Sequence, residues 1–285
     1  MIWRNASVRI GGVALALLLA LALAAPWLGT VDPSLFDAAS RDLRPMQAGE
    51  IITLDGETLR HRFLMGSDSF GRDIYSRVLY GARVSLIVGL ACALAALACG
   101  IVLGLLAGTL RWLDGPLMRV MDGVMAIPAI LIAIALVALW RASLPTVILA
   151  IAIPEIPRVT RLVRALVLTI REEPYVEAAI SLGTPTAKIM FGHILPNAAA
   201  PLIVQGTYIV GFAILTEAAL SFLGVGLPPD IPTWGNIMAE GRVQFVAYPH
   251  NVFFPGVFLA VTVLAVNMLG DGLRDTLDPK MARRL

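Results

Sequence analysis

Long runs of apolar residues, separated by short polar stretches, dominate this chain from end to end. A helix of about 20 apolar residues is long enough to cross the hydrocarbon core of a membrane. Six segments reach that length: residues 8–28, 82–110, 117–140, 144–168, 201–225 and 252–273. The pattern predicts an all-α polytopic membrane protein with six transmembrane helices. Residues 1–285 are expected to form a single transmembrane domain whose core covers residues 82–275.

Charge is distributed unevenly between the two sets of connections. Residues 30–76 hold more carboxylates than arginines, whereas basic residues gather at the chain ends and at the alternate loops. Because cytoplasmic loops carry an excess of Lys and Arg, we predict that both termini are cytoplasmic. Residues 30–76, the turn near Arg141 and the loop 227–251 then face outward. The residues assigned to the cytoplasmic side are Arg4, Arg9, Arg111, Arg119, Arg158, Arg161, Arg164, Arg171, Lys188, Arg274, Lys280, Arg283 and Arg284.

The first apolar run also has features of a cleaved signal peptide. Two arginines precede it, and Ala22 and Ala24 form a small-x-small pattern near its end. The run is longer than a signal core of about 7–15 residues, which favours a retained span. Sequencing the mature N-terminus distinguishes the two cases.

Composition excludes several classes of protein. The chain is 58% hydrophobic and 15% charged, with a mean hydropathy of +0.81, which excludes a soluble domain. A net charge of +2 gives no reason to expect a nucleic-acid partner. Cys92, Cys99 and the three histidines lack the spacing of a metal site or a disulfide framework, so we expect no metal ligand set.

One polar segment, residues 170–197, is expected to form two short helices on the cytoplasmic face. Pro174 suits a first helical turn, and Gly183 suits the position that ends a helix. Thr184 and Pro185 then resemble an N-cap and first-turn pair that begins a second helix, which runs to about His193.

Small side chains on the first of these helices favour protein docking over lipid anchoring. Ala178, Ala179 and Gly183 lie on or near one predicted face, where they leave a shallow groove. Glu177 adds an acceptor beside it. A helix that only rests on lipid normally presents large apolar side chains instead. We therefore predict that this segment, with Leu195 and Pro196 behind it, docks a soluble partner.

Four motifs resemble one transporter family. Residues 177–196 resemble the EAA loop of ATP-binding cassette (ABC) importer permeases. Met65 to Leu86, Ala219 to Met238 and Asn267 to Lys280 resemble motifs of the dipeptide, oligopeptide and nickel permeases, specifically of the second permease subunit. The departures are His193 in the EAA loop and Leu227, Asp230 and Ile231 in the outer loop.

The resemblance implies a type I ABC importer permease in the bacterial inner membrane. Its expected partners are a homologous permease, two ATP-binding subunits and an extracytoplasmic binding protein. ATP and Mg²⁺ would belong to the ATP-binding subunits, because this chain lacks a P-loop and is not expected to be an enzyme or to hold a cofactor. The residues expected to couple it to ATP hydrolysis are Glu177, Ala178, Ala179, Gly183, Thr184, Pro185, Leu195 and Pro196.

Substrate is left open by the sequence. Di- and oligopeptides are the broadest expectation for the family, and nickel, metal chelates, glutathione and opine-like compounds are alternatives. A proton-coupled secondary transporter is an alternative of a different class, in which Glu155 or Glu217 carries protons. No inverted repeat is evident to favour it.

Polar residues inside the predicted spans are candidates for the translocation path, because charge in a bilayer is unfavourable and usually functional. Glu217, Gln205, Tyr208 and Asn267 either line a wet cavity or form interhelical hydrogen bonds. Glu155, between two prolines, either lines the path or belongs to a helix break.

Other features of the spans have structural explanations. We expect Asp122 and Asp271 to pair locally with Arg119 and Arg274. The repeat of Gly100, Gly104 and Gly108 predicts close helix packing. Pro201 weakens the predicted start of the fifth span, where it is expected to act as a pivot.

Overall fold

The structure is a computed structural model that describes residues 5–53 and 56–277. Arg4, Lys280, Arg283 and Arg284 of the predicted cytoplasmic set lie outside the described residues. The helices are α1 (Ala6–Ala24), α2 (Ile74–Thr109), α3 (Arg111–Met125), α4 (Ala129–Leu139), α5 (Leu144–Ala152), α6 (Ile156–Arg171), α7 (Pro174–Ser181), α8 (Thr186–Ile189), α9 (Leu195–Phe222), α10 (Trp234–Gly241) and α11 (His250–Leu277). The strands are β1 (Gln47–Ile52) and β2 (Thr58–Phe63).

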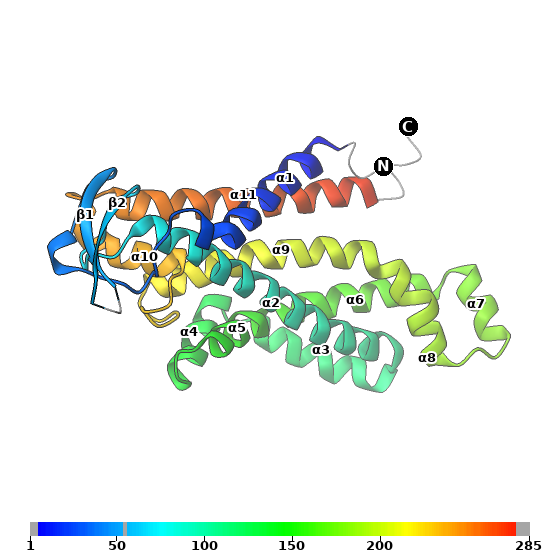
Figure 1. Cartoon of the computed structure of the whole chain (residues 1–285). Coiled ribbons are helices and arrows are strands. Elements are labelled where there is room, and N and C mark those ends of the chain that lie inside the picture. The colour runs from blue at the N-terminus through cyan, green and yellow to red at the C-terminus, as the bar shows by residue number, and fades with distance from the viewer. Residues whose placement is uncertain (1–4, 54–55, 278–285) are drawn as a thin grey trace.

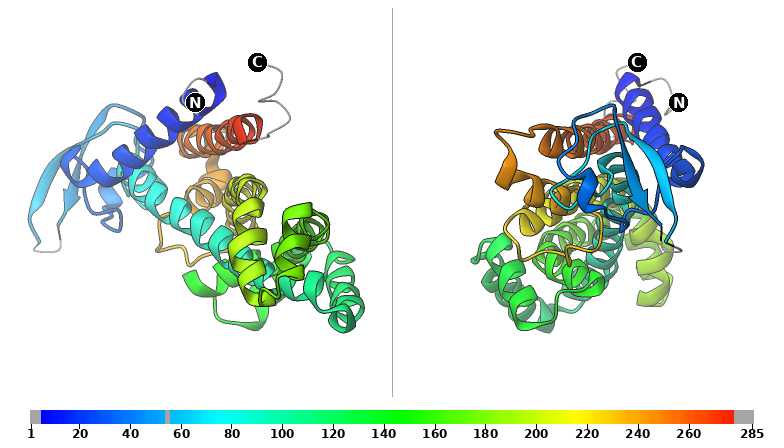
Figure 2. Two further views of the ribbon diagram at one scale, coloured as in Figure 1. Left: turned by 90° about the vertical axis from the view of Figure 1, so that its right-hand side faces the viewer. Right: turned by 60° about the vertical axis from the view of Figure 1, so that its left-hand side comes forward.

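The helices form an elongated bundle with different structures at its two ends. β1, β2 and α10 lie at one end, and α7 and α8 lie at the other (Figure 1). The start of α1 and the end of α11 both point toward the end that carries α7. α1 packs along α11, and together they form a layer to one side of the helices α2 to α6 (Figure 2).

The bundle is held together by close contact between α2 and α6. Gly104 faces Val163, and Gly108 faces Val167 one turn further along. A Cβ atom added at Gly104 would lie only 2.5 Å from the Val163 Cβ, and one added at Gly108 would lie 2.6 Å from the Val167 Cβ. Side chains spaced four residues apart share one face of a helix. The predicted packing role of the glycine repeat is therefore confirmed.

The count of membrane-spanning helices is lower than the sequence predicted. Within residues 5–53 and 56–277, four helices are long and apolar enough to cross a membrane, or five when the bent pair α3 and α4 counts as one span. α3 and α4 meet at an angle of 86°. Pro128 caps α4, and a proline cannot continue the hydrogen-bonded ladder of the preceding helix. The predicted span 117–140 is thus two helices.

The predicted fourth span is also interrupted. Between α5 and α6 the chain forms a single 3₁₀ turn, Ile153–Glu155, which contains Pro154. Pro157 follows in the first turn of α6. The predicted break at Glu155 is confirmed. The helical run from α5 to α6 is not among the spanning candidates, and it carries Glu155 and three arginines before Leu166.

The outer segment departs from the all-α prediction. β1 and β2 form an antiparallel hairpin in which Gln47 pairs with Phe63 and Ile52 pairs with Thr58. Ile51 and Phe63 are buried, whereas their neighbours along each strand are exposed. One face of the hairpin therefore packs against the protein, which explains why this polar segment orders. The sequence prediction treated it only as a loop.

Candidate functional site

The predicted docking segment is ordered by a defined turn between α7 and α8. Gly183 has a φ of +74°, a conformation that glycine adopts at the least energetic cost. Its N–H donates to the Ile180 carbonyl at 2.9 Å, and the Thr184 N–H donates to the Ala179 carbonyl at 3.0 Å. This pair of bonds is a Schellman motif, which satisfies the last carbonyls of α7. The predicted role of Gly183 in ending the helix is confirmed.

The start of the second helix differs from the prediction. α8 begins at Thr186, and its N-cap is Pro185, which forms no side-chain cap. Thr184 is therefore not the N-cap, because its N–H completes the turn that ends α7. α8 does not end near His193 either. It continues through a π-helical turn, Met190–Ile194, directly into α9.

The exposed surface of this segment is partly apolar. Glu177, Ala178 and Gly183 are exposed as predicted, and nothing lies within 4 Å of a Cβ atom placed on Gly183. Ala179 is buried, because α7 turns it and Val176 toward the bundle. The predicted groove therefore has two small residues rather than three. Larger apolar side chains of this segment are also exposed: Leu182 (86%), Phe191 (64%) and Ile180 (50%).

α7 is tied to the start of α9 by hydrogen bonds. Nδ2 of Asn197 donates to the Tyr175 hydroxyl at 3.1 Å and to the His193 carbonyl at 2.6 Å. Leu195 and Pro196 form the first turn of α9. Pro201 lies inside α9 and not at its start, so the predicted pivot at a helix start is wrong. The π-helical turn before Leu195 is the irregular position, and such turns often mark functional sites.

Ion pairs connect α3 to α6 near the same end. Arg164 Nη2 donates to Asp114 at 2.6 Å, and Arg161 pairs with Asp122. The predicted local pair of Asp122 with Arg119 is therefore wrong, since α6 supplies a better-placed guanidinium. Asp271 and Arg274 form no ion pair among the residues that the structure describes.

The predicted path residues do not share one environment. Glu217 is fully buried and accepts a hydrogen bond of 2.8 Å from the Ser221 hydroxyl. Glu155 is also fully buried, and both of its oxygens lie within 3.1 Å of Arg158. Tyr208 and Asn267 are exposed, and Gln205 is half-buried. Glu217 and Glu155 thus do not open directly onto the surface of this chain, whereas the other three residues do.

A cavity of about 670 Å³ is bordered by α6, α9 and α11. Gln205 lines it from α9, Leu162 lines it from α6, and Arg274 lines it from α11. Asn197, Ala200, Pro201, Val204 and Leu277 complete the lining. The cavity therefore opens near the end of the bundle that carries α7. No group of three or more His, Cys, Asp or Glu residues within the described ranges is placed to hold a metal ion.

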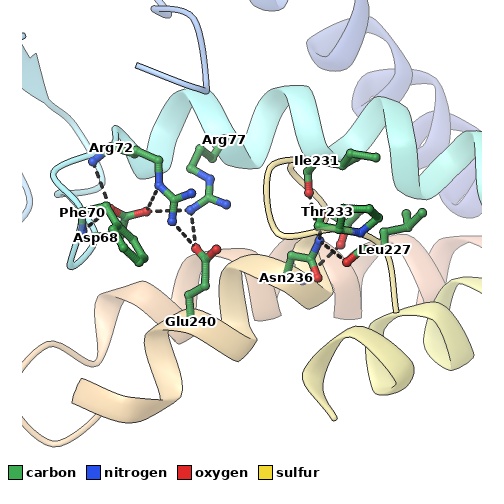
Figure 3. Close-up of polar contacts among 10 residues, drawn as sticks. Asp68, Phe70, Arg72, Arg77, Leu227, Ile231, Thr233, Asn236 and Glu240 are labelled. Atoms are coloured by element: carbon green, nitrogen blue, oxygen red, sulfur yellow. Dashed lines mark hydrogen bonds and ion pairs between the residues drawn. The ribbon is translucent and has the colours of Figure 1, made fainter. Parts of the chain in front are cut away.

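A buried ionic cluster at the opposite end was not predicted from the sequence (Figure 3). Glu240 of α10 accepts from Arg72 and Arg77, each at 2.5 Å, and Asp68 accepts from the same arginines at 2.7 and 2.6 Å. Arg77 is only 1% exposed. Asp68 also accepts from the Phe70 and Arg72 amides, so it caps this turn as well. The cluster joins the outer segment, α2 and α10.

Asn236 fixes the outer loop that leads into α10. Its Nδ2 donates to the carbonyls of Leu227, Pro228 and Ile231 at 3.2, 2.9 and 3.0 Å (Figure 3). These acceptors are backbone atoms, so the contacts do not depend on which side chains stand at positions 227 and 231. The departures from the family motif at Leu227 and Ile231 therefore leave this arrangement intact.

Helices of membrane-crossing length define a polytopic membrane protein, and the segment of α7 and α8 is exposed at one end of it. A family model described as the binding-protein-dependent transport system inner membrane component matches residues 100–283. The chain belongs to this family, as the resemblance implied.

Relatives of known name cover nearly the whole chain. It is 48% identical over 281 residues to "Probable peptide ABC transporter permease protein y4tQ" of Sinorhizobium fredii, covering 99% of this chain and 91% of the relative. It is 43% identical over 274 residues to "Di/tripeptide transport system permease protein DppC" of Pseudomonas aeruginosa, covering 95% and 88%. It is 43% identical over 273 residues to "Glutathione transport system permease protein GsiD" of Salmonella paratyphi A, covering 95% and 85%.

A solved structure shares the fold. A chain of the MetNI methionine ABC transporter in an inward-facing conformation aligns with a TM-score of 0.59 and 17% identity. The alignment covers 71% of this chain and 97% of that one. The similarity supports the permease fold of the helical core.

Proposed function

We propose that this chain is the second permease subunit of an ATP-driven importer that brings di- or oligopeptides into the cytoplasm. It would lie in the bacterial inner membrane and pair with a homologous permease. Two ATP-binding subunits would drive it, and an extracytoplasmic binding protein would deliver the peptide. ATP and Mg²⁺ would be bound by the ATP-binding subunits, and this chain would perform no chemistry.

The observation that carries the proposal is the exposed docking segment. Ile180 and Leu182 of the Gly183 turn and Phe191 of the π-helical turn are apolar and exposed. Exposed apolar side chains of this kind mark a surface that another protein covers. The peptide relatives, at 43% and 48% identity over nearly the whole chain, support the substrate class.

The arrangement of the chain ends supports the proposed orientation. The start of α1 and the end of α11 lie toward the end of the bundle that carries α7 (Figure 1). A docking segment for ATP-binding subunits has to face the cytoplasm, where ATP is found. Both ends of the chain are then cytoplasmic, and the β1–β2 hairpin faces outward. Six spans follow if α3 with α4, and α5 with α6, each cross the membrane as a broken helix.

Transport would follow from the linkage of ATP binding to the position of α7. Binding of ATP closes the two ATP-binding subunits onto each other. If α7 is bound to these subunits, its preferred position differs between their open and closed states. The continuous path from α8 through the π-helical turn into α9 passes this displacement to the membrane.

The test is reconstituted uptake. The four transporter subunits are placed in vesicles with ATP inside, and the binding protein and labelled tri-alanine are added outside. Uptake that requires both ATP and the binding protein supports the proposal. Uptake by this chain alone, driven by a proton gradient, would instead support the alternative of a secondary transporter. If nickel, a metal chelate or glutathione is taken up faster than tri-alanine, that compound and not a peptide is the substrate.

A further inference from the structure

Arg158 is a charged residue at an unusual position in the helical bundle. It lies in the first turn of α6, directly after the 3₁₀ turn that separates α5 from α6. The sequence pattern placed it with the cytoplasmic basic residues. α6 continues to Arg171, however, so about 13 residues and ~20 Å of helix separate Arg158 from that end. Arg158 therefore lies well inside the bundle rather than in a loop.

The guanidinium of Arg158 is only partly engaged. Nη1 donates to both oxygens of Glu155, at 3.0 and 3.1 Å. Among the residues that the structure describes, Nε and Nη2 of Arg158 have no acceptor. The side chain is 39% exposed, whereas the Glu155 side chain is fully buried. One nitrogen thus binds the carboxylate, and the opposite edge of the guanidinium is open.

Aromatic side chains of α9 lie close to the Arg158 guanidinium. The guanidinium carbon of Arg158 lies 5.5 Å from the centre of the Phe212 ring. The Phe212 ring stacks on Tyr208 with their centres 6.2 Å apart. Tyr208 is exposed. The Arg158 cation of α6 and the two rings of α9 therefore lie next to one another, and the buried Glu155 carboxylate contacts the same guanidinium.

The same faces of α6 and α9 lead into the cavity near the docking segment. Leu162 is one turn after Arg158 on α6, and Gln205 is one turn before Tyr208 on α9, so each pair shares a helix face. Both Leu162 and Gln205 line the cavity of about 670 Å³, and Arg274 lines it as well. Arg158 and Tyr208 thus lie one helical turn from residues of this cavity, to which Arg274 adds a second positive charge.

The chemistry around Arg158 favours binding of an anionic group. A partly exposed guanidinium is unfavourable against lipid, so this face must line water or protein. The Nε and Nη2 atoms of arginine form a planar fork that matches the two oxygens of a carboxylate. Glu155 keeps part of the positive charge neutralised, which limits how tightly a second carboxylate is held. A path residue needs such weak binding, because the solute has to leave again.

We propose that Arg158 is a substrate-binding residue of the translocation path, which takes the terminal carboxylate of a passing peptide through its free Nε and Nη2 edge. The proposal rests on the proposed function of peptide import. It adds a selective step within the membrane, separate from selection by the binding protein.

The experiment compares two peptides in the reconstituted importer described above. Initial uptake rates are measured for tri-alanine and for tri-alanine amide, which lacks the terminal carboxylate. The same binding protein is used throughout, so a change in the ratio of the two rates reports on this chain. Arg158→Gln is expected to lower tri-alanine uptake by about tenfold, as for one lost charge-assisted hydrogen bond, and to leave uptake of the amide unchanged.

Two further variants sharpen the result. Arg161→Gln removes the same charge from the same helix, but Arg161 is engaged with Asp122, and the ratio is expected to match that of the wild type. Arg158→Lys keeps the charge without the fork and is expected to transport tri-alanine at an intermediate rate. An equal loss for both peptides in Arg158→Gln, or equal uptake of tri-alanine by the Lys and Gln variants, overturns the proposal. A wild-type importer that hydrolyses ATP but transports neither peptide rejects peptide import itself.

Discussion

Gly104 of α2 and Val163 of α6 are in such close contact that there is no room for a side chain between them. A Cβ atom added at Gly104 would lie 2.5 Å from the Val163 Cβ and 2.7 Å from the Thr160 carbonyl oxygen. The carbonyl is backbone and cannot move aside as a flexible side chain can. The spacing of α2 and α6 is therefore set by the absence of a side chain at this position.

Gly104→Leu is expected to destabilise the protein. Overpacking of a close helix contact costs about 1–3 kcal/mol, and the backbone contact places this site at the upper end. The measurement is the melting temperature of the purified complex in detergent. Gly115→Leu is the matched control, because nothing lies within 4 Å of a Cβ atom at Gly115. Equal melting temperatures for the two variants would contradict the packing role.

Gly183→Val is expected to uncouple transport from ATP hydrolysis. Its φ of +74° is unfavourable for a β-branched residue by about 1–2 kcal/mol, so the α7–α8 turn has to change. Since no atom lies near its Cβ position, the effect comes from backbone strain and not from a clash. Gly183→Asn is the control, because asparagine tolerates this conformation. The ratio of peptides transported to ATP hydrolysed is measured, and normal coupling in the Val variant would refute the assignment.

Leu182→Asp is expected to weaken association with the ATP-binding subunits. The side chain is 86% exposed, so the change leaves the fold of this chain intact. A carboxylate is unfavourable in an apolar contact that another protein covers. Co-purification of the ATP-binding subunits with the permease pair is the measurement. Val246→Asp, at a residue that is 98% exposed in the outer loop, should not change the yield. If Val246→Asp reduces the yield as much as Leu182→Asp does, α7 is not the specific contact with the ATP-binding subunits.

Glu240→Gln is expected to lower the stability of the outer end by about 1–3 kcal/mol. The change removes a counter-charge from the buried Arg77, which then keeps Asp68 as its one acidic partner within the described residues. The melting temperature should fall and should do so at high salt as well, because buried pairs are screened little. Asp230→Asn, at an exposed loop position, is the control. A melting temperature equal to that of the control would show that the cluster contributes nothing.

Local signals in the sequence predicted the turn between α7 and α8. Gly183 is followed by Pro185, and this combination correctly predicted that one helix ends and another begins within a few residues. The burial of Ala179 was not predictable, since it depends on which face α7 turns toward the bundle, where Val176 packs with Ile189 and Ile194. Spacing along one helix indicates which residues share a face, but it does not indicate which face the rest of the protein covers.

The main features that could not be predicted from the sequence were contacts between residues that lie far apart in the chain. Glu240 lies more than 160 residues after Arg77 in the chain, and their contact depends on the packing of α10 beside α2. Asp122 was assigned to the nearer Arg119, yet it pairs with Arg161 of α6. Hydropathy also overestimated the continuity of residues 117–140, because Pro128 divides an apolar run without lowering its average hydropathy by much.

The π-helical turn at Met190–Ile194 lets α8 and α9 act as one body. Residues from Thr186 to Phe222 form a helical run of 37 residues, or about 55 Å, and α10 packs against α9. A continuous helical run of this length that is displaced at one end is displaced at the other end as well. On the proposed function, a displacement of α8 by the ATP-binding subunits would therefore also shift the far end of α9, where α10 packs.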